Sequence, residues 1–258
     1  MFEQALSFKR KLESDQLCIG VCICFTDPTV SEALCPEVDY LWIDMEHGAL
    51  TIESVQGHIM ATKGTDTAPV VRVPWNDPVL VKPVLDAGAA GVIIPMVRSA
   101  SDVQRAIAAA LYPPAGGRGY GPKRPSEHGR HSGAQFCKDA NDAMIVIVQI
   151  EHIDAVENID EIVAVAGLTA IVVGPNDLSG SMGLTGEPRH PRVLDAIGHV
   201  IERARAGSVP PGIAVGSDPT ILCEWADRGA QWLTMGADFL LLTRAAREVA
   251  GKVRAHAK

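Results

Sequence analysis

Ionisable side chains follow several short apolar runs of this sequence, at the point where each run ends. Glu151 and Asp177 each follow such a run, and so do Arg72 and the polar group at positions 44–47. Two carboxylates such as Glu151 and Asp177 could bind a hard divalent cation. The cation's other positions would go to water and a chelating substrate, as Mg²⁺ and Mn²⁺ sites prefer.

Each of these residues also has an ordinary structural interpretation. Asp177 could cap the helix that follows it, and Glu151 could pair with a lysine or an arginine. Arg72 could form an ion pair at the rim of the fold, and His47 could be a hydrogen-bonded loop residue. Taken singly, the two interpretations are equally good, but their occurrence together at several run ends favours a site.

The elements that would position these residues are eight β-branched runs with amphipathic segments between them. The runs are Leu17–Cys24, Asp39–Met45, Pro69–Val73, Gly91–Met96, Met144–Ile150, Thr169–Gly174, Gly212–Val215 and Trp232–Met235. The segments include Ile52–Thr62, Val79–Ala87, Ser101–Ala110, Pro191–Ala206 and Pro219–Arg228. Strands that alternate with helices pair in parallel, and eight such units predict an α/β fold, the (β/α)8 or TIM barrel, with its site at the C-terminal strand ends. An open doubly wound sheet is the alternative, disfavoured because no Gly-x-Gly-x-x-Gly turn follows the first run.

Three segments lie outside this repeat. Met1–Glu13 predicts an extra N-terminal helix that could cap the barrel floor, and Phe239–Lys258 predicts a long C-terminal helix. The segment Tyr112–Asp142 is rich in Pro, Gly, Arg and His, and structureless loops of that length are uncommon unless they are functional. No linker or low-complexity tract interrupts the chain, so we expect residues 1–258 to form one barrel domain.

Composition narrows the choice of partners and compartment. The chain has 31 acidic and 23 basic residues, a net charge of −8, which makes nucleic acid an unfavourable partner. No apolar run approaches the roughly 20 residues of a membrane span, and the N-terminal residues lack the apolar region of a signal peptide. Cys18, Cys22 and Cys24 share one strand parity, which predicts small apolar core residues rather than a metal or redox site. A reducing cytoplasm is the expected compartment.

The motifs resemble those of a known family. They are Asp44-x-Glu46-His47-Gly48, Arg72 in Val-Arg-Val-Pro, Gln149-Ile-Glu151 and Gly174-Pro175-x-Asp177-Leu178. In this order they resemble the metal-dependent (class II) 2-keto-3-deoxy acid aldolases, the family of 4-hydroxy-2-oxoheptanedioate aldolase, 2-dehydro-3-deoxyglucarate aldolase and macrophomate synthase. The resemblance extends from about Gly20 to Ala246.

The resemblance implies an activity and a role for each site residue. The expected reaction is reversible cleavage of a 4-hydroxy-2-oxo acid to pyruvate and an aldehyde, with Mg²⁺, Mn²⁺ or Co²⁺ held by Glu151 and Asp177. Arg72 would hold the keto oxygen, and His47, oriented by Asp86, would be the acid/base; Asp44 belongs to the same catalytic group. The substrate would also contact Gln149, Pro175, Asn176 and Asp177, with backbone N–H groups receiving the pyruvate carboxylate (Pro175 has none to give).

The chemistry is consistent with these implied roles. Removing a proton from the pyruvate methyl group creates an enolate, whose charge a Lewis-acid cation and Arg72 would stabilise as it forms. Histidine titrates near neutrality when unperturbed, which suits His47 as a proton carrier. No lysine follows these runs, which disfavours a Schiff-base aldolase. Members of the family are typically hexamers, trimers paired through their C-terminal helices, which fits the long helix Phe239–Lys258.

The long loop departs from the pattern of the dicarboxylate-specific members. It is locally basic and could overhang the barrel rim or reach a neighbouring subunit's mouth. There Lys123 and Arg124 could attract a hydroxylated or carboxylated aldehyde; a solvated basic loop that helps subunits adhere is the equal alternative. Two other functions remain open. One is a lyase of a malyl- or citramalyl-CoA thioester, and the other is a barrel that binds a keto acid without catalysis.

Overall fold

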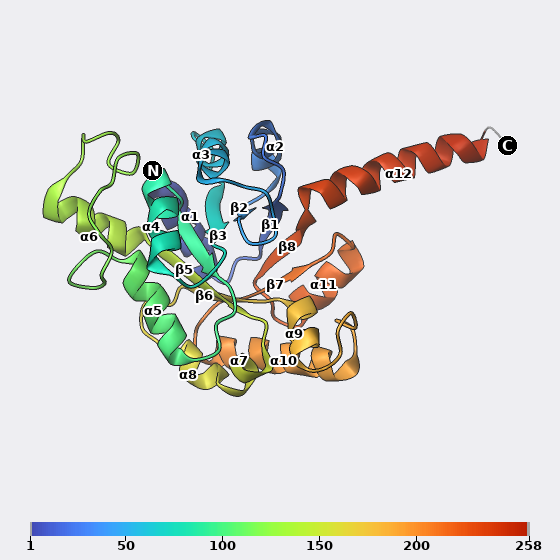
Figure 1. Ribbon diagram of the computed structural model, residues 1–258. Coiled ribbons are helices and arrows are strands. Elements are labelled where there is room, and N and C mark those ends of the chain that lie inside the picture. The colour runs from blue at the N-terminus through green and yellow to red at the C-terminus, as the bar shows by residue number, and fades with distance from the viewer. Residues whose placement is uncertain (1, 257–258) are drawn as a thin grey trace.

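A computed structural model describes residues 2–256, and in it eight parallel strands close into a barrel in chain order (Figure 1). The strands are β1 (Cys18–Ile23), β2 (Tyr40–Asp44), β3 (Ala68–Arg72), β4 (Gly91–Ile94), β5 (Ile145–Ile150), β6 (Ala170–Val173), β7 (Pro211–Val215) and β8 (Trp232–Ala237). β8 pairs in parallel with β1 and closes the sheet. The predicted (β/α)8 barrel is therefore confirmed, and each observed strand begins and ends within two residues of its predicted run.

Helices surround the barrel and connect its strands. They are α1 (Phe2–Glu13), α2 (Thr29–Leu34), the short 3-10 helix η1 (Cys35–Glu37), α3 (Ile52–Ala61), α4 (Pro78–Ala87), α5 (Ala100–Ala110), α6 (Gly133–Ala143), α7 (Ile153–Glu157), α8 (Ile159–Val163), α9 (Pro175–Ser181), α10 (Pro191–Ala206), α11 (Pro219–Asp227) and α12 (Asp238–His256). The interpretation of 112–142 as one long loop was wrong in part, because α6 begins at Gly133.

The sequence at α4 shows how a connecting helix is delimited. The Asp77 carboxylate accepts a hydrogen bond from the N–H of Val79 at 2.8 Å, and Pro78 occupies the first turn, where a missing N–H costs nothing. Gly88 ends the helix with a φ of +102°, a conformation that suits glycine. Asp77 is therefore a capping residue, and α4 runs from the mouth of the barrel back to its floor.

The floor of the barrel is closed by α1, as predicted. Phe8 on this helix is buried, and its ring centroid lies 5.1 Å from that of Tyr40 inside the barrel. The Tyr40 ring in turn meets the edge of the Trp232 ring, 5.4 Å away. Gly20 makes room for these rings, because a Cβ there would lie 2.3 Å from the Tyr40 ring. The barrel interior is thus packed at the floor and polar only toward the mouth.

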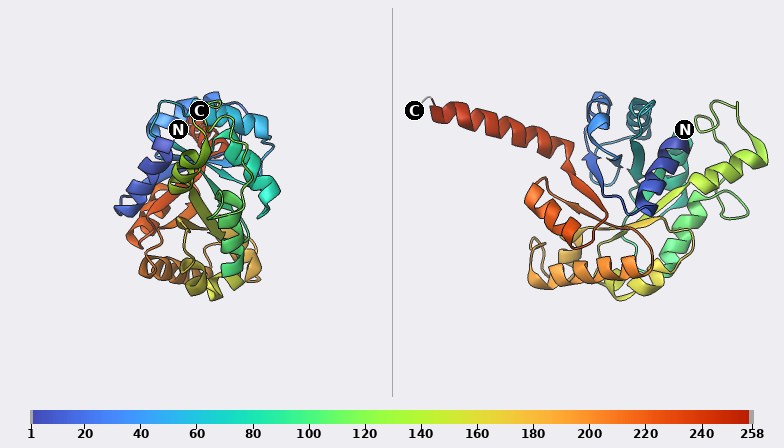
Figure 2. Two further views of the ribbon diagram at one scale, coloured as in Figure 1. Left: turned by 90° about the vertical axis from the view of Figure 1, so that its left-hand side faces the viewer. Right: turned by 180° about the vertical axis from the view of Figure 1, so that it is seen from behind.

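The last helix, α12, leaves the barrel at the mouth end and projects into solvent (Figures 1 and 2). Its 19 residues span about 28 Å. Leu242, Val249 and Val253 are all more than 60 % exposed on it. Its first residue, Asp238, is buried and accepts hydrogen bonds from the backbone N–H groups of Cys24 (3.0 Å) and Phe25 (2.9 Å). The base of the helix is therefore fixed to the end of β1, while the rest makes few contacts with its own chain.

The basic segment 112–132 lies at the other end of the molecule. It follows α5, which like α4 returns toward the floor, and it packs near α1 and the end of α4 (Figure 1). Arg124 donates a hydrogen bond to the carbonyl of Ala87 at 3.2 Å, at the end of α4. Among residues 2–256 there is no helix with the length and apolar character that a membrane crossing needs.

Candidate active site

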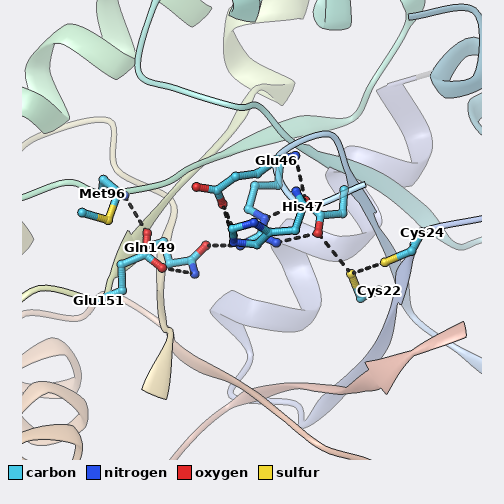
Figure 3. A network of polar contacts seen from close by, with 9 residues as sticks. Cys22, Cys24, Glu46, His47, Met96, Gln149 and Glu151 are labelled. Carbon is cyan, nitrogen blue, oxygen red and sulfur yellow. Dashed lines mark hydrogen bonds and ion pairs between the residues drawn. The ribbon is translucent and has the colours of Figure 1, made fainter. Parts of the chain in front are cut away.

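The ends of β2, β3 and β5 bring the predicted polar residues together at the barrel mouth (Figure 3). Asp44 is the last residue of β2, and Arg72, the last residue of β3, lies beside it in the strand register. Gln149 and Glu151 come from the end of β5. Asp177 stands in the first turn of α9, directly after β6.

A buried ion pair fixes the arginine of this cluster. The Arg72 guanidinium grips the Asp44 carboxylate with two hydrogen bonds, Nε to Oδ1 at 2.9 Å and Nη2 to Oδ2 at 2.5 Å. The side chains are 9 % and 3 % exposed. Burial disfavours the charged guanidinium, but the bonds to Asp44 outweigh it, so the pKa of Arg72 is raised and the charge is permanent. The third nitrogen, Nη1, donates a hydrogen bond to Gln149 Oε1 at 3.4 Å and also lies beside the Glu46 carboxylate.

Glu151 is buried and oriented from both sides. Its Oε1 accepts the backbone N–H of Met96 at 2.7 Å, and its Oε2 accepts Gln149 Nε2 at 2.5 Å. The pKa of Glu151 is raised to about 7, chiefly by burial and also by the nearby carboxylates of Glu46 and Asp177. Burial makes this carboxylate costly to ionise, and a bound divalent cation would offset that cost.

Glu46 adds a third carboxylate to the cluster. Its Oε2 lies 2.8 Å from Arg72 Nη1, yet the geometry is not that of a hydrogen bond, and this buried oxygen has no hydrogen-bond partner. Burial, together with the charges of Asp44 and Asp177, raises the pKa of Glu46 above its usual value despite the nearby Arg72. This buried oxygen pairs with Arg72 but accepts no hydrogen bond, and it lies near the charges of Glu151 and Asp177, so it could also bind a hard divalent cation.

Gly174 leaves the space in which these carboxylates sit. A Cβ at this position would lie 2.7 Å from Gln149 Nε2 and 2.9 Å from Glu151 Oε2. The backbone at Gly174 is extended and would accept any residue, so the close approach alone requires glycine. The residues present therefore fit the divalent cation that the sequence predicts.

His47 lies at the same mouth but on its open side. Its side chain is 63 % exposed, and Nε2 is 3.7 Å from Glu46 Oε2. The backbone N–H of His47 donates to Asp44 Oδ1 at 3.4 Å, which ties the loop after β2 to the ion pair. A histidine in this position can exchange protons with solvent and with a ligand bound among the carboxylates.

The structure does not bring Asp86 to His47. Asp86 lies near the floor end of α4, where its carboxylate accepts a hydrogen bond from Arg118 Nη2 at 2.7 Å. Within one chain the two residues are therefore apart, because α4 carries Asp86 away from the mouth, and the expected pairing with His47 stays a prediction. Lys123 and Arg124 lie in the floor-side segment for the same topological reason, so they do not overhang their own mouth, and a contact with the aldehyde at a neighbouring subunit's mouth stays a prediction.

Two contributors to the site were missed from the sequence. Glu46 stands between Asp44 and His47, and its place in that motif was a sufficient signal. Met96, directly after β4, has a φ of +54°, which non-glycine residues seldom adopt, and this strained backbone aims its N–H at Glu151. No feature of the sequence indicates that conformation.

A cavity of about 460 Å³ opens on the β1, β7 and β8 side of the barrel. It lies between the ends of β1, β7 and β8 and the starts of α9 and α12, with Pro175 and Asn176 on one wall and Leu240 on another. Cys22 also faces it. The expected packing of the cysteines holds for Cys18, which is fully buried, whereas Cys22 and Cys24 are half-buried at the mouth.

A barrel with a fixed arginine, an exposed histidine and clustered carboxylates at its mouth is suited to lyase chemistry. Comparison with known proteins places the chain more narrowly: it belongs to the HpcH/HpaI aldolase/citrate lyase family, which matches residues 25–245. It is 36 % identical to a 4-hydroxy-2-oxo-heptane-1,7-dioate aldolase of Salmonella paratyphi C, over 95 % of this chain and 94 % of that protein.

Solved structures of other proteins support the same family assignment. A family member from Burkholderia cenocepacia superposes with a TM-score of 0.91 at 32 % identity, covering 96 % of this chain and 99 % of the other. The HpcH/HpaI aldolase from Desulfitobacterium hafniense gives a TM-score of 0.85 at 31 % identity, covering 94 % and 95 % of the two chains. The predicted family and aldolase class are confirmed.

Proposed function

We propose that this protein is a divalent-metal-dependent aldolase that reversibly cleaves a 4-hydroxy-2-oxo acid to pyruvate and an aldehyde. The observation that carries the proposal is the buried Asp44–Arg72 pair, whose Nη1 lies 2.8 Å from Glu46 Oε2, near the charges of Glu151 and Asp177. Relatives that bear the name of such an aldolase support the same conclusion.

The carboxylates would hold the cation, with Glu151 and Asp177 as ligands and Glu46 next to them. A bound divalent ion supplies Lewis-acid polarisation of the substrate's keto group. Mg²⁺, Mn²⁺ and Co²⁺ are all compatible with an oxygen-rich site.

Arg72 stabilises the negative charge that develops on the keto oxygen. Because Asp44 holds the guanidinium in place before substrate binds, little reorganisation is needed as the charge forms. His47 moves the proton between the pyruvate methyl carbon and solvent or the aldehyde oxygen. The backbone N–H groups of Asn176 and Asp177 receive the substrate carboxylate, while Pro175 shapes the wall and donates nothing. Gln149 holds Glu151 and can contact the keto acid.

We also propose that the protein self-associates through α12. The exposed apolar residues of α12 favour burial against another copy, and the family resemblance points to a hexamer. A contact between Asp86 and His47, or between the Lys123 and Arg124 segment and an aldehyde, would then have to join two subunits. Mixing His47→Ala with Asp86→Asn subunits tests this: a shared site regains up to about one quarter of wild-type activity, by random pairing. No recovery would exclude the shared site.

Proton exchange, followed by two substrate assays, separates this function from the two alternative functions. The protein is incubated with pyruvate in D₂O with and without Mg²⁺, Mn²⁺ or Co²⁺, and exchange of the methyl protons is followed by NMR. Exchange that requires the cation excludes a non-catalytic keto-acid-binding barrel. A panel of aldehydes and an acetyl-CoA binding assay follow. Binding of the thioester without aldehyde turnover would instead support the malyl- or citramalyl-CoA lyase.

A further inference from the structure

Two thiols and a carboxylate meet at the mouth, beside the carboxylate cluster but apart from it (Figure 3). Cys22 Sγ lies 3.8 Å from Cys24 Sγ and 3.9 Å from Asp44 Oδ2. The three atoms all lie within 4.8 Å of one another. Neither cysteine takes part in the proposed aldolase chemistry.

These separations suit a tetrahedral cation. Zinc–sulfur bonds of about 2.3 Å place two thiolate sulfurs about 3.8 Å apart, and a carboxylate oxygen at about 2.1 Å lies about 3.6 Å from each sulfur. The observed 3.8 Å and 3.9 Å are close to these values, so small side-chain adjustments complete a three-ligand site. Water from the adjoining cavity, which Cys22 lines, can take the fourth position.

We propose that Cys22, Cys24 and Asp44 form a binding site for one thiophilic divalent cation, Zn²⁺ or Cd²⁺, and that its occupation inhibits the enzyme. Thiolates select such ions, whereas Mg²⁺ and Mn²⁺ prefer the oxygens of Glu151 and Asp177. The two cation sites therefore differ in ligand chemistry as well as in place.

Inhibition follows from the second role of Asp44. Its Oδ2 already accepts Arg72 Nη2 at 2.5 Å, so a cation on this oxygen competes with the guanidinium. Binding releases the two thiol protons, and the two thiolates balance the two positive charges of the cation. Arg72 loses half of its bidentate anchor and can no longer be held against the keto oxygen. This consequence rests on the proposed aldolase function, whereas the binding itself does not.

The binding test uses the whole protein and needs no activity. The metal-free protein is titrated with Cd²⁺, and the near-ultraviolet thiolate-to-metal charge-transfer band is recorded. We expect a band that saturates at one Cd²⁺ per chain, that Cys24→Ala abolishes, and that Glu151→Gln and Cys223→Ala retain. Cys223 is an exposed cysteine on α11 and serves as the matched control. Absence of the band in the wild type, or its persistence in Cys24→Ala, overturns the site.

The inhibition test then follows methyl-proton exchange of pyruvate at saturating Mg²⁺ while Zn²⁺ is added. Cys24→Ala should raise the Zn²⁺ concentration for half-inhibition at least about tenfold, as loss of a ligand does, and further Mg²⁺ should not relieve inhibition of the wild type. Equal inhibition of both proteins, or full relief by Mg²⁺, would mean that Zn²⁺ acts at the carboxylate site and overturns the inhibitory role. If exchange is absent from every sample while the band is present, the aldolase proposal fails and the cation site stands.

Discussion

Binding of the catalytic cation should displace a proton from Glu151. The pKa of this buried carboxyl is about 7 without a cation, chiefly because burial disfavours its charge. A cation needs the ionised form, so its apparent affinity falls as the pH drops below that pKa. With a pKa of about 7, the protonated fraction is about 0.9 at pH 6 and about 0.1 at pH 8. The apparent affinity should therefore be about tenfold lower at pH 6 than at pH 8.

Isothermal titration calorimetry with Mn²⁺ measures this linkage. Titrations in two buffers of different ionisation enthalpy give the number of protons released, which should be about 0.9 at pH 6 and about 0.5 at pH 7. The Glu46→Gln variant is the control, because it changes the pKa of Glu151 without removing the Glu151 carboxylate. Because the Glu46 charge raises the pKa of Glu151, its removal should lower the release at pH 7. Proton release near zero at both pH 6 and pH 7 would refute the reasoning, since Glu151 would then be ionised before the cation binds.

Three further perturbations test the site and the assembly. Arg72→Lys keeps the charge but loses the paired bonds to Asp44, so kcat should fall by about 100-fold or more with little change in fold; an unchanged kcat would make Arg72 structural. Gly174→Ala should weaken Mn²⁺ binding at least about tenfold by crowding Glu151, whereas Gly180→Ala, whose Cβ would meet nothing closer than 3.7 Å, should not; equal affinities would contradict the crowding argument. Val249→Asp should lower the oligomeric mass measured by light scattering, and an unchanged mass would show that α12 does not join subunits.

The sequence predicted the barrel well because its strands are buried on both faces. β5, for example, is buried along its whole length, and such parallel strands appear as continuous β-branched runs. The same pattern located the strand ends, and therefore the mouth residues Arg72 and Glu151, without knowledge of the structure.

Our interpretation of the sequence did not indicate correctly at which end of the barrel two residues of the connecting segments lie. Asp86 sits where a helix has already returned to the floor, and the segment of Lys123 follows another returning helix, so neither can face its own mouth. The alternation of strands and helices contains that information, because a helix that follows a strand runs back toward the floor. The positive φ of Met96 had no comparable signal, because tertiary contacts impose it on a residue that seldom adopts it.

The buried carboxylate of Asp238 links the projecting helix α12 to the catalytic rim, so activity per chain can depend on the protein concentration. Asp238 is the first residue of α12, and it also holds the N–H groups of Cys24 and Phe25 where β1 ends at the mouth. A displacement of the projecting helix can therefore reach the catalytic rim through Asp238. Turnover per chain should then depend on protein concentration, with dilute enzyme slower than concentrated enzyme even when substrate and cation are saturating.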